Sequence, residues 1–281
     1  MITRLLFVGP YKLVDSAISL QFDANLIPKP DRTIVHVRLL DPSVDVLALY
    51  NSYGIDTSTF TVMEDLEFLR NINIDDKALH QYGGWIAQQL LKFLALDNTD
   101  SDHFLIQDSD TFAIKPYRYI MNHIPNWFIL SQRTLDQRYD QYVYKLTGVT
   151  RQTTDSFITD FAPLSKKDWV MIKQCIETRS NTNWLDTLMA EFKNDRAPIG
   201  FSEYELMGNW MSVHSQILVQ VQEQIHITDI DIPNIKNKTY VLPNRSNIDV
   251  VGFKNFIRLD FTDVDYLTNL IKGKNGNTKL T

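Results

Sequence analysis

Short β-branched segments alternate with helical segments through residues 4–107, and this alternation restricts the fold more than any other feature of the chain. The segments expected to be strands are residues 4–8, 32–39, 58–63 and 103–107. The segments between them that are expected to be helical are residues 15–21, 43–53 and 79–96. Because a strand–helix–strand crossover places its two strands parallel in one sheet, this order predicts an α/β fold. We expect a mixed, mainly parallel sheet flanked by helices.

The second half of the sequence continues this pattern less regularly. Strands are predicted at residues 127–132, 156–162 and 225–232, and helices at residues 169–178, 184–194 and 202–216. The sequence contains no internal repeat and no glycine- or proline-rich linker that would mark a domain boundary. We therefore expect one domain over residues 1–272, followed by a small, polar and disordered tail at 273–281.

Charge and cysteine content exclude several classes of protein. The 281 residues carry a formal net charge of -6, whereas surfaces that bind nucleic acid are basic, so no nucleic-acid partner is expected. Cys175 is the single cysteine, which excludes an intrachain disulfide framework and a cysteine-rich zinc site. The apolar run near the N-terminus is too short for a signal peptide, and no segment has the length of a transmembrane span. These features predict a cytoplasmic protein.

One Asp-x-Asp pair stands out from the others by its position. The chain has 34 acidic residues and spells this pair four times, so the spelling alone carries little information. Asp108 and Asp110 directly follow the apolar residues 104–106, where a buried strand should end. Ligands bind at the carboxyl ends of the strands in open parallel sheets. Two carboxylates there could share Mg²⁺ or Mn²⁺ with substrate phosphates, or could form a polar loop after the strand.

The helical segment at 79–96 carries polar residues opposite its apolar face. Gln89 and Lys92 lie on this polar side in a helical projection. A polar side of this kind is typical of a helix face in contact with solvent, and it also allows the two side chains to point at a ligand.

A second acidic cluster begins the helix expected at 202–216. Ser202 and Glu205 have the spacing of a capping box, which accounts for both without any chemistry. Glu203 then occupies the first helical position, where the helix dipole favours an ionised carboxylate.

Three segments of this chain resemble known glycosyltransferase sequences. FLIQDSDTFAIKP is similar to the Asp-x-Asp segment of GT-A glycosyltransferases. GWIAQQLLKFLAL, IQDSDTF and GFSEYELMGNW, in this order, resemble a poorly characterised group of microbial glycosyltransferase-like proteins, and the likeness covers residues 4–210. The resemblance implies a GT-A, Rossmann-like fold, a UDP- or GDP-sugar donor, a glycan or glycolipid acceptor, and Mn²⁺ or Mg²⁺ as cofactor.

The same resemblance gives the residues near the donor their expected roles. Pro10 and Tyr11 correspond to the place where such enzymes hold the base and the ribose. Gln89 and Lys92 would face the donor side of their helix, and Asp108 would contact the donor through the cation.

The resemblance also implies metal and acceptor residues. Asp108 and Asp110 would hold the cation, and His226, in a late strand, would be a further ligand. Glu203 would contact the acceptor or, in an inverting enzyme, deprotonate its hydroxyl group.

Two other functions remain compatible with these segments. A sugar nucleotidyltransferase shares the doubly wound sheet and the carboxylate-bound Mg²⁺, but in this chain GPYKLVD stands where such an enzyme has a glycine-rich basic loop. A non-catalytic carbohydrate-binding or assembly protein on a GT-A scaffold is the second, because a glycine-rich segment before the catalytic helix is missing. Four aromatic residues are candidates for stacking on a sugar ring: Trp127, Tyr139, Tyr142 and Tyr144.

Overall fold

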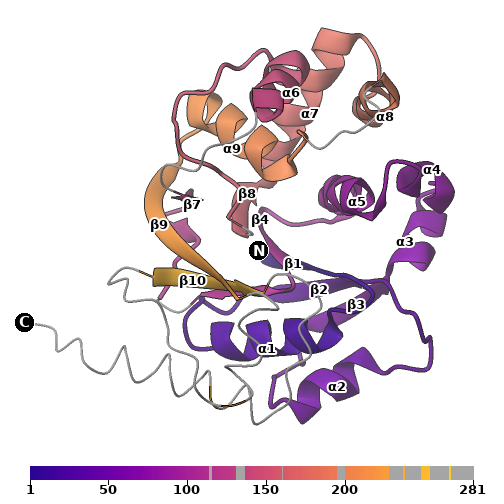
Figure 1. The fold of residues 1–281 in the computed structure, drawn as a ribbon, viewed down its shortest axis with the longest axis vertical. Coiled ribbons are helices and arrows are strands. Elements are labelled where there is room, and N and C mark those ends of the chain that lie inside the picture. Colours follow the sequence, from indigo (N-terminus) through magenta and orange to yellow (C-terminus); the bar gives the residue numbers. More distant parts are fainter. Residues whose placement is uncertain are drawn as a thin grey trace, which may run out of the picture.

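Two five-stranded sheets and a set of helices make up the described part of the chain (Figure 1). The computed structural model describes residues 1–113, 116–130, 137–159, 161–194, 200–227, 237, 248–253 and 266. The tail expected at 273–281 lies outside the described residues, and the single domain expected over 1–272 stays a prediction.

The first sheet contains the strands predicted in the first half of the chain and one more at its edge. Its order is β3 (Phe60–Glu64), β2 (Arg32–Val37), β1 (Ile2–Val8), β4 (His103–Asp108) and β8 (Phe161–Ser165). The first four strands are parallel, and β8 runs antiparallel to β4. The predicted mixed, mainly parallel sheet is therefore confirmed. Because β2 and β4 lie on opposite sides of β1, the crevice between β1 and β4 is a topological switch point, where ligands bind in sheets of this kind.

Helices cover both faces of the first sheet (Figure 1). One face carries α1 (Leu13–Asp23) and α2 (Val46–Ser52), and the other carries α3 (Asp65–Asn71), α4 (Asp76–His80) and α5 (Gly84–Asn98). In β1, Leu6 faces the first group of helices and Leu5 faces the second, and both are fully buried. Burial on both faces explains why this strand is continuously apolar rather than alternating.

The second sheet and the remaining helices extend from the β8 side. The sheet order is β5 (Thr111–Ala113), β10 (Ile248–Phe253), β9 (Leu218–Ile227), β7 (Ile124–Leu130) and β6 (Ile120–Met121). The helices are α6 (Gln137–Thr147), α7 (Lys166–Ser180), α8 (Trp184–Asn194) and α9 (Glu203–His214). Trp169 of α7 stacks on Phe93 of α5 at 4.9 Å, and Trp184 of α8 meets Trp169 edge to face. Aromatic packing thus fixes α7 and α8 against α5.

The single helix predicted at 79–96 is wrong, because two helices occupy this segment. α4 ends at His80 and α5 begins at Gly84. Gly83 lies between them with φ 95°, a backbone conformation that glycine adopts without steric cost. The apolar pattern continues across this break because Leu79 and Ile86 pack into the same core.

The second half departs further from the predicted elements. The strand predicted at 156–162 is shifted, since β8 covers Phe161–Ser165. α6 and β10 were not predicted in this half, and neither were α3, β5 and β6 in the first half.

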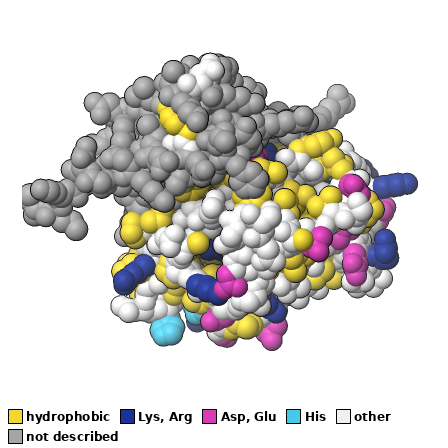
Figure 2. Space-filling model, turned by 90° about the horizontal axis from the view of Figure 1, so that it is seen from below, with side chains coloured by type: hydrophobic (Ala, Val, Ile, Leu, Met, Phe, Trp, Pro, Cys, Tyr) yellow, Lys and Arg dark blue, Asp and Glu magenta, His cyan; other side chains and the backbone are white. Residues whose placement is uncertain are grey.

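The face that carries α1 and α2 mixes charges of both signs. Figure 2 shows acidic and basic side chains among hydrophobic ones in the described part of this face. Within the described residues, no helix combines the length and the apolar character that are needed to cross a bilayer.

Candidate functional site

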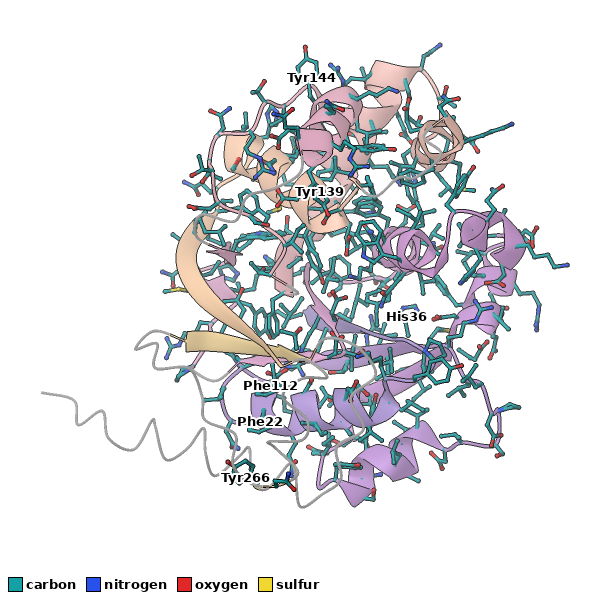
Figure 3. The ribbon with its side chains drawn as sticks, viewed as in Figure 1. Phe22, His36, Phe112, Tyr139, Tyr144 and Tyr266 are labelled. Atoms are coloured by element: carbon teal, nitrogen blue, oxygen red, sulfur yellow. The ribbon has the colours of Figure 1, made fainter. Side chains whose placement is uncertain are left out.

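A row of side chains marks the carboxyl end of the first sheet, on the face that α5 covers. Phe7 of β1 pairs in the strand register with His36 of β2 on one side and with Asp108 of β4 on the other. Directly paired residues project to the same face of a sheet, so these three side chains point toward α5. Figure 3 shows His36 in the space between the sheet and helices α3 to α5. The row lies at the topological switch point, where a ligand is expected.

Lys92 of α5 joins the two acidic segments that the sequence singled out. Its Nζ is 2.5 Å from Oδ1 of Asp108 and 2.5 Å from Oε1 of Glu203, and it donates to the hydroxyl of Tyr204 at 3.2 Å. The side chains of Lys92 and Glu203 are each 3% exposed. Burial acts to lower the pKa of Lys92, but the carboxylates of Asp108 and Glu203 outweigh it and raise the pKa above its ordinary value. Lys92 is therefore a buried ammonium group held by two acids, and the interpretation of this helix side as a solvated face is wrong for it.

Glu203 is held at the start of α9 by its neighbours. The Ser202 side chain caps the helix by accepting from the backbone N–H of Glu205 at 3.4 Å. The backbone N–H of Glu203 donates to Oε1 of Gln89, which is itself 2% exposed, at 3.0 Å. The Nε2 of Gln89 is buried and has no hydrogen-bond partner among the described residues. Gln89 and Lys92 thus fix the N-terminal end of α9 beside the carboxyl end of β4.

The Glu205 side chain does not complete the expected capping box. Its Oε1 accepts from the Ser156 hydroxyl at 2.8 Å and from the backbone N–H of Phe157 at 3.0 Å. Its Oε2 accepts from Arg151 at 2.6 Å and from Asn209 at 2.9 Å. This fully buried carboxylate has enough partners to offset its burial, and it fastens residues 156–157 to α9. Glu205 is therefore a structural residue.

Asp110 is linked to a second lysine. Lys12, at the start of α1, lies 3.3 Å from Oδ2 of Asp110 and 3.1 Å from Oδ2 of Asp15. Burial raises the pKa of Asp15 to about 6, although Lys12 acts in the opposite direction. Two cationic side chains thus meet the Asp-x-Asp segment, one at each acid.

Asp108 and Asp110 are the described residues best suited to a divalent cation. Their side chains are 22% and 30% exposed, so phosphate oxygens of a ligand could reach the same ion. Carboxylates combined with substrate phosphates are the oxygen donors that Mg²⁺ takes. Among the described residues, no third His, Cys, Asp or Glu completes a metal-binding group with them. The pair fits a cation that arrives with a diphosphate better than one held by the protein alone.

Asp108, Glu203 and the lysine between them, Lys92, form what we call the acidic cluster. A pocket of about 520 Å³ opens beside it, between the carboxyl ends of β1 and β2 and helices α3 to α5. Phe7 lines the pocket, and the centroid of its ring lies 5.9 Å from Nζ of Lys92. The pocket and the acidic cluster therefore share one wall. Pro10 lines the pocket as well, whereas Tyr11 is 62% exposed beyond it. The rest of the wall is mostly apolar, with a few polar side chains.

His36 and Asp65 are pocket residues that the sequence reasoning missed. Both line the cavity, and both are buried. Burial lowers the pKa of His36 to about 3 and raises the pKa of Asp65 to about 7. The sequence does contain a sign of His36: it stands two residues after the buried Ile34 in β2, so its side chain points to the same, core-facing side of the strand.

The remaining candidates divide into three groups. His226 belongs to β9, but its side chain is outside the described part of the chain. Trp127 and Tyr142 are buried core residues and do not present a ring to a sugar. Tyr139 and Tyr144 project from α6 in Figure 3, and Tyr144 is 58% exposed.

Several solved glycosyltransferase structures are similar to this chain. The bifunctional glycosyltransferase WbbM is 10% identical, with a TM-score of 0.52 over 96% of this chain and 49% of its own. This chain thus spans about half the length of WbbM. The galactosyltransferase LgtC, solved with donor and acceptor sugar analogs, is 10% identical, with a TM-score of 0.49 over 96% and 95% of the two chains. Mouse xyloside xylosyltransferase 1 is 9% identical, with a TM-score of 0.47 over 92% and 100%.

The similarity to WbbM supports the GT-A-like fold expected from the sequence. None of the curated protein sequences compared matches this chain. A family model described as "Family of unknown function (DUF6492)" matches residues 33–246, which include the carboxyl ends of β2 and β4 and the start of α9. The chain therefore belongs to the DUF6492 family.

Proposed function

We propose that this chain is a glycosyltransferase that moves a sugar from a UDP- or GDP-linked donor to a hydroxyl group of a glycan or glycolipid. The observation that carries the proposal is the shared wall at Phe7. At this wall, a pocket of about 520 Å³ lies next to a cluster of two acids and a lysine at the switch point of a parallel sheet. The GT-A-like fold and the resemblance of the QDSD and SEYE segments to glycosyltransferase-like proteins support it.

In this proposal the donor lies along the row of side chains at the sheet edge. The nucleoside occupies the pocket beside Pro10, and the diphosphate lies over Asp108 and Asp110. These two carboxylates would hold Mn²⁺ or Mg²⁺, which when bound neutralises negative charge on the departing diphosphate. Lys12 and Lys92 add positive charge on either side of the same position.

Glu203 is the proposed contact for the acceptor. The acceptor oxygen forms a bond to the anomeric carbon while the bond from that carbon to the diphosphate breaks, and the diphosphate leaves with the electron pair. In an inverting reaction, Glu203 takes the acceptor proton. Because Lys92 is 2.5 Å from Glu203, this role requires Lys92 to move closer to the donor phosphates as the acceptor binds.

The lysine pairs also favour a second candidate function. Asp108 and Asp110 each have a lysine partner, as they would in a protein that binds sugar nucleotides or glycans without turnover. Such a protein would bind the same ligands with little dependence on a divalent cation.

The test compares two aspartates that belong to two different Asp-Ser-Asp segments. Asp110→Asn should lower Mn²⁺-dependent sugar transfer, and hydrolysis of the donor, roughly 100-fold or more, because a cation ligand is lost. Asp100→Asn changes an exposed acid of another Asp-x-Asp pair, before β4, and should leave both rates unchanged. Equal activity of Asp110→Asn and the unchanged protein would contradict the cation assignment. An unchanged protein that binds UDP- or GDP-sugars without turnover would favour the second candidate.

A further inference from the structure

Two buried polar atoms lie side by side in the wall of the pocket without hydrogen bonds. Nδ1 of His36 and Oδ1 of Asp65 have no hydrogen-bond partner among the described residues, and they are 3.9 Å apart, too far to bond each other. His36 is 2% exposed and Asp65 is 9% exposed. Buried polar groups in folded proteins are almost always hydrogen-bonded, because an unpaired one loses its contact with water. These two atoms are neighbours on one pocket wall, which makes this wall the place to look for a ligand that supplies their hydrogen-bond partners.

Two neighbouring aromatic side chains fix the orientation of the His36 ring. The ring stacks on Phe7 at 5.0 Å, with 10° between the planes, and meets Phe68 edge to face at 5.0 Å. With its pKa lowered by burial, His36 is neutral at physiological pH and carries one N–H donor. Asp65 belongs to the first turn of α3, where the helix dipole accounts for a carboxylate but does not supply its missing hydrogen bond.

The mouth of the pocket is suited to a flat, weakly polar ring. Leu40 and Trp85 line the pocket and are 61% and 48% exposed, so they lie where the pocket meets solvent. They provide apolar surface for the faces of a planar heterocycle, whose polar edge would then meet His36 and Asp65.

We propose that His36 and Asp65 recognise the hydrogen-bonding edge of the donor nucleobase. Asp65 accepts from a ring N–H, and His36 donates from Nδ1 to the adjacent carbonyl oxygen. Uracil and guanine both present this N–H beside a carbonyl group. This inference rests on the proposed function, because it assigns the nucleoside to the pocket, and it goes further by naming the residues that select the base.

The test measures nucleotide affinity and thermal stability on the same variants. Asp65→Asn replaces a charged acceptor with a neutral one and should weaken the binding of UDP or GDP about 10-fold, while raising Tm because an unpaired buried charge is removed. His36→Phe keeps the aromatic stack and should also weaken binding about 10-fold. Glu67→Gln, an exposed acid in the same first turn of α3, is the matched control and should change neither quantity. Pyrophosphate should bind Asp65→Asn and the unchanged protein equally.

A second test changes the nucleotide instead of the protein. Methylation of the ring N–H, as in 3-methyl-UDP or 1-methyl-GDP, should weaken binding to the unchanged protein roughly 10- to 100-fold. Unchanged affinity of Asp65→Asn and of the methylated nucleotides, in a protein that binds UDP or GDP, would overturn this inference alone. A protein that binds none of these nucleotides would overturn both this inference and the proposed function.

Discussion

At the scale of single residues, Lys92 determines the electrostatics of the site. It places one positive charge between Asp108 of β4 and Glu203 of α9, two elements that are far apart in the sequence. Removing one member of a buried ion pair leaves its partner charged and desolvated. The site is therefore sensitive to a loss of charge at this position in a way that a surface ion pair is not.

Lys92→Met should lower the free energy of unfolding by about 3 to 5 kcal/mol, because both carboxylates lose their shared cation. Urea denaturation measures this change. Lys29→Met removes an exposed partner of Asp56 and should have a much smaller effect, because water screens this pair. Equal effects of the two substitutions would show that the ammonium group of Lys92 does not compensate these acids.

The raised pKa of Asp65 makes the stability of the folded protein depend on pH. Burial and the nearby Glu64 and Asp76 raise its pKa from 3.8 to about 7 in the folded protein, while Arg38 acts in the opposite direction and neighbouring His36 is neutral. Between these two pKa values the folded state binds more protons than the unfolded state, so this group makes stability fall as pH rises from about 4 to 7.

Asp65→Asn should therefore raise stability by an amount that grows over the same pH interval, to at most about 4 kcal/mol near neutral pH. Thermal unfolding of both proteins at pH 4.5 and pH 7.5 measures the difference. A gain that is largest at pH 4.5 would contradict the assigned cause.

At the scale of elements, the turn between α4 and α5 shapes the pocket wall. Gly83 has φ 95° and ψ 157°, a combination found essentially in glycine alone, whereas φ of adjacent Gly84 is ordinary. A Cβ at either position would meet no atom within 4 Å, so the two glycines differ in backbone conformation rather than in space.

Gly83→Ala should lower the free energy of unfolding by about 1 to 3 kcal/mol through backbone strain. Gly84→Ala is the matched control and should be neutral or stabilise by up to about 1 kcal/mol, because alanine restricts the unfolded chain. Urea denaturation of both variants tests this contrast. A loss of similar size at both positions would show that side-chain space, not φ, is limiting.

The elements also show how far the sequence allows prediction. β1, β4 and the helix polarity that marks Gln89 and Lys92 were readable because each signal lies within one segment. The meeting of Lys92 with Glu203 depends on contacts between segments 111 residues apart, which periodicity does not encode. The proximity of His36 and Asp65 could not be predicted for the same reason, because it is the folded sheet that brings β2 and the start of α3 together.

At the scale of the whole molecule, the strand order explains why these residues converge. β1 is the central strand from which the chain adds β2 and β3 on one side and β4 on the other. The pocket lies on the β2 side and the acidic cluster on the β4 side, with Phe7 between them. An extended ligand with a flat ring at one end and a diphosphate further along matches this arrangement.

The proposed donor site is tested most directly by a thermal-shift screen of the unchanged protein. The screen uses nucleotide sugars, free nucleotides and nucleoside triphosphates, each with and without Mn²⁺. We predict that a UDP- or GDP-sugar raises Tm and that Mn²⁺ increases the shift, since the diphosphate and the two aspartates would share the cation. A response to nucleoside triphosphates alone would instead indicate a nucleotidyltransferase. No response to any nucleotide, with or without Mn²⁺, would contradict the proposed donor site.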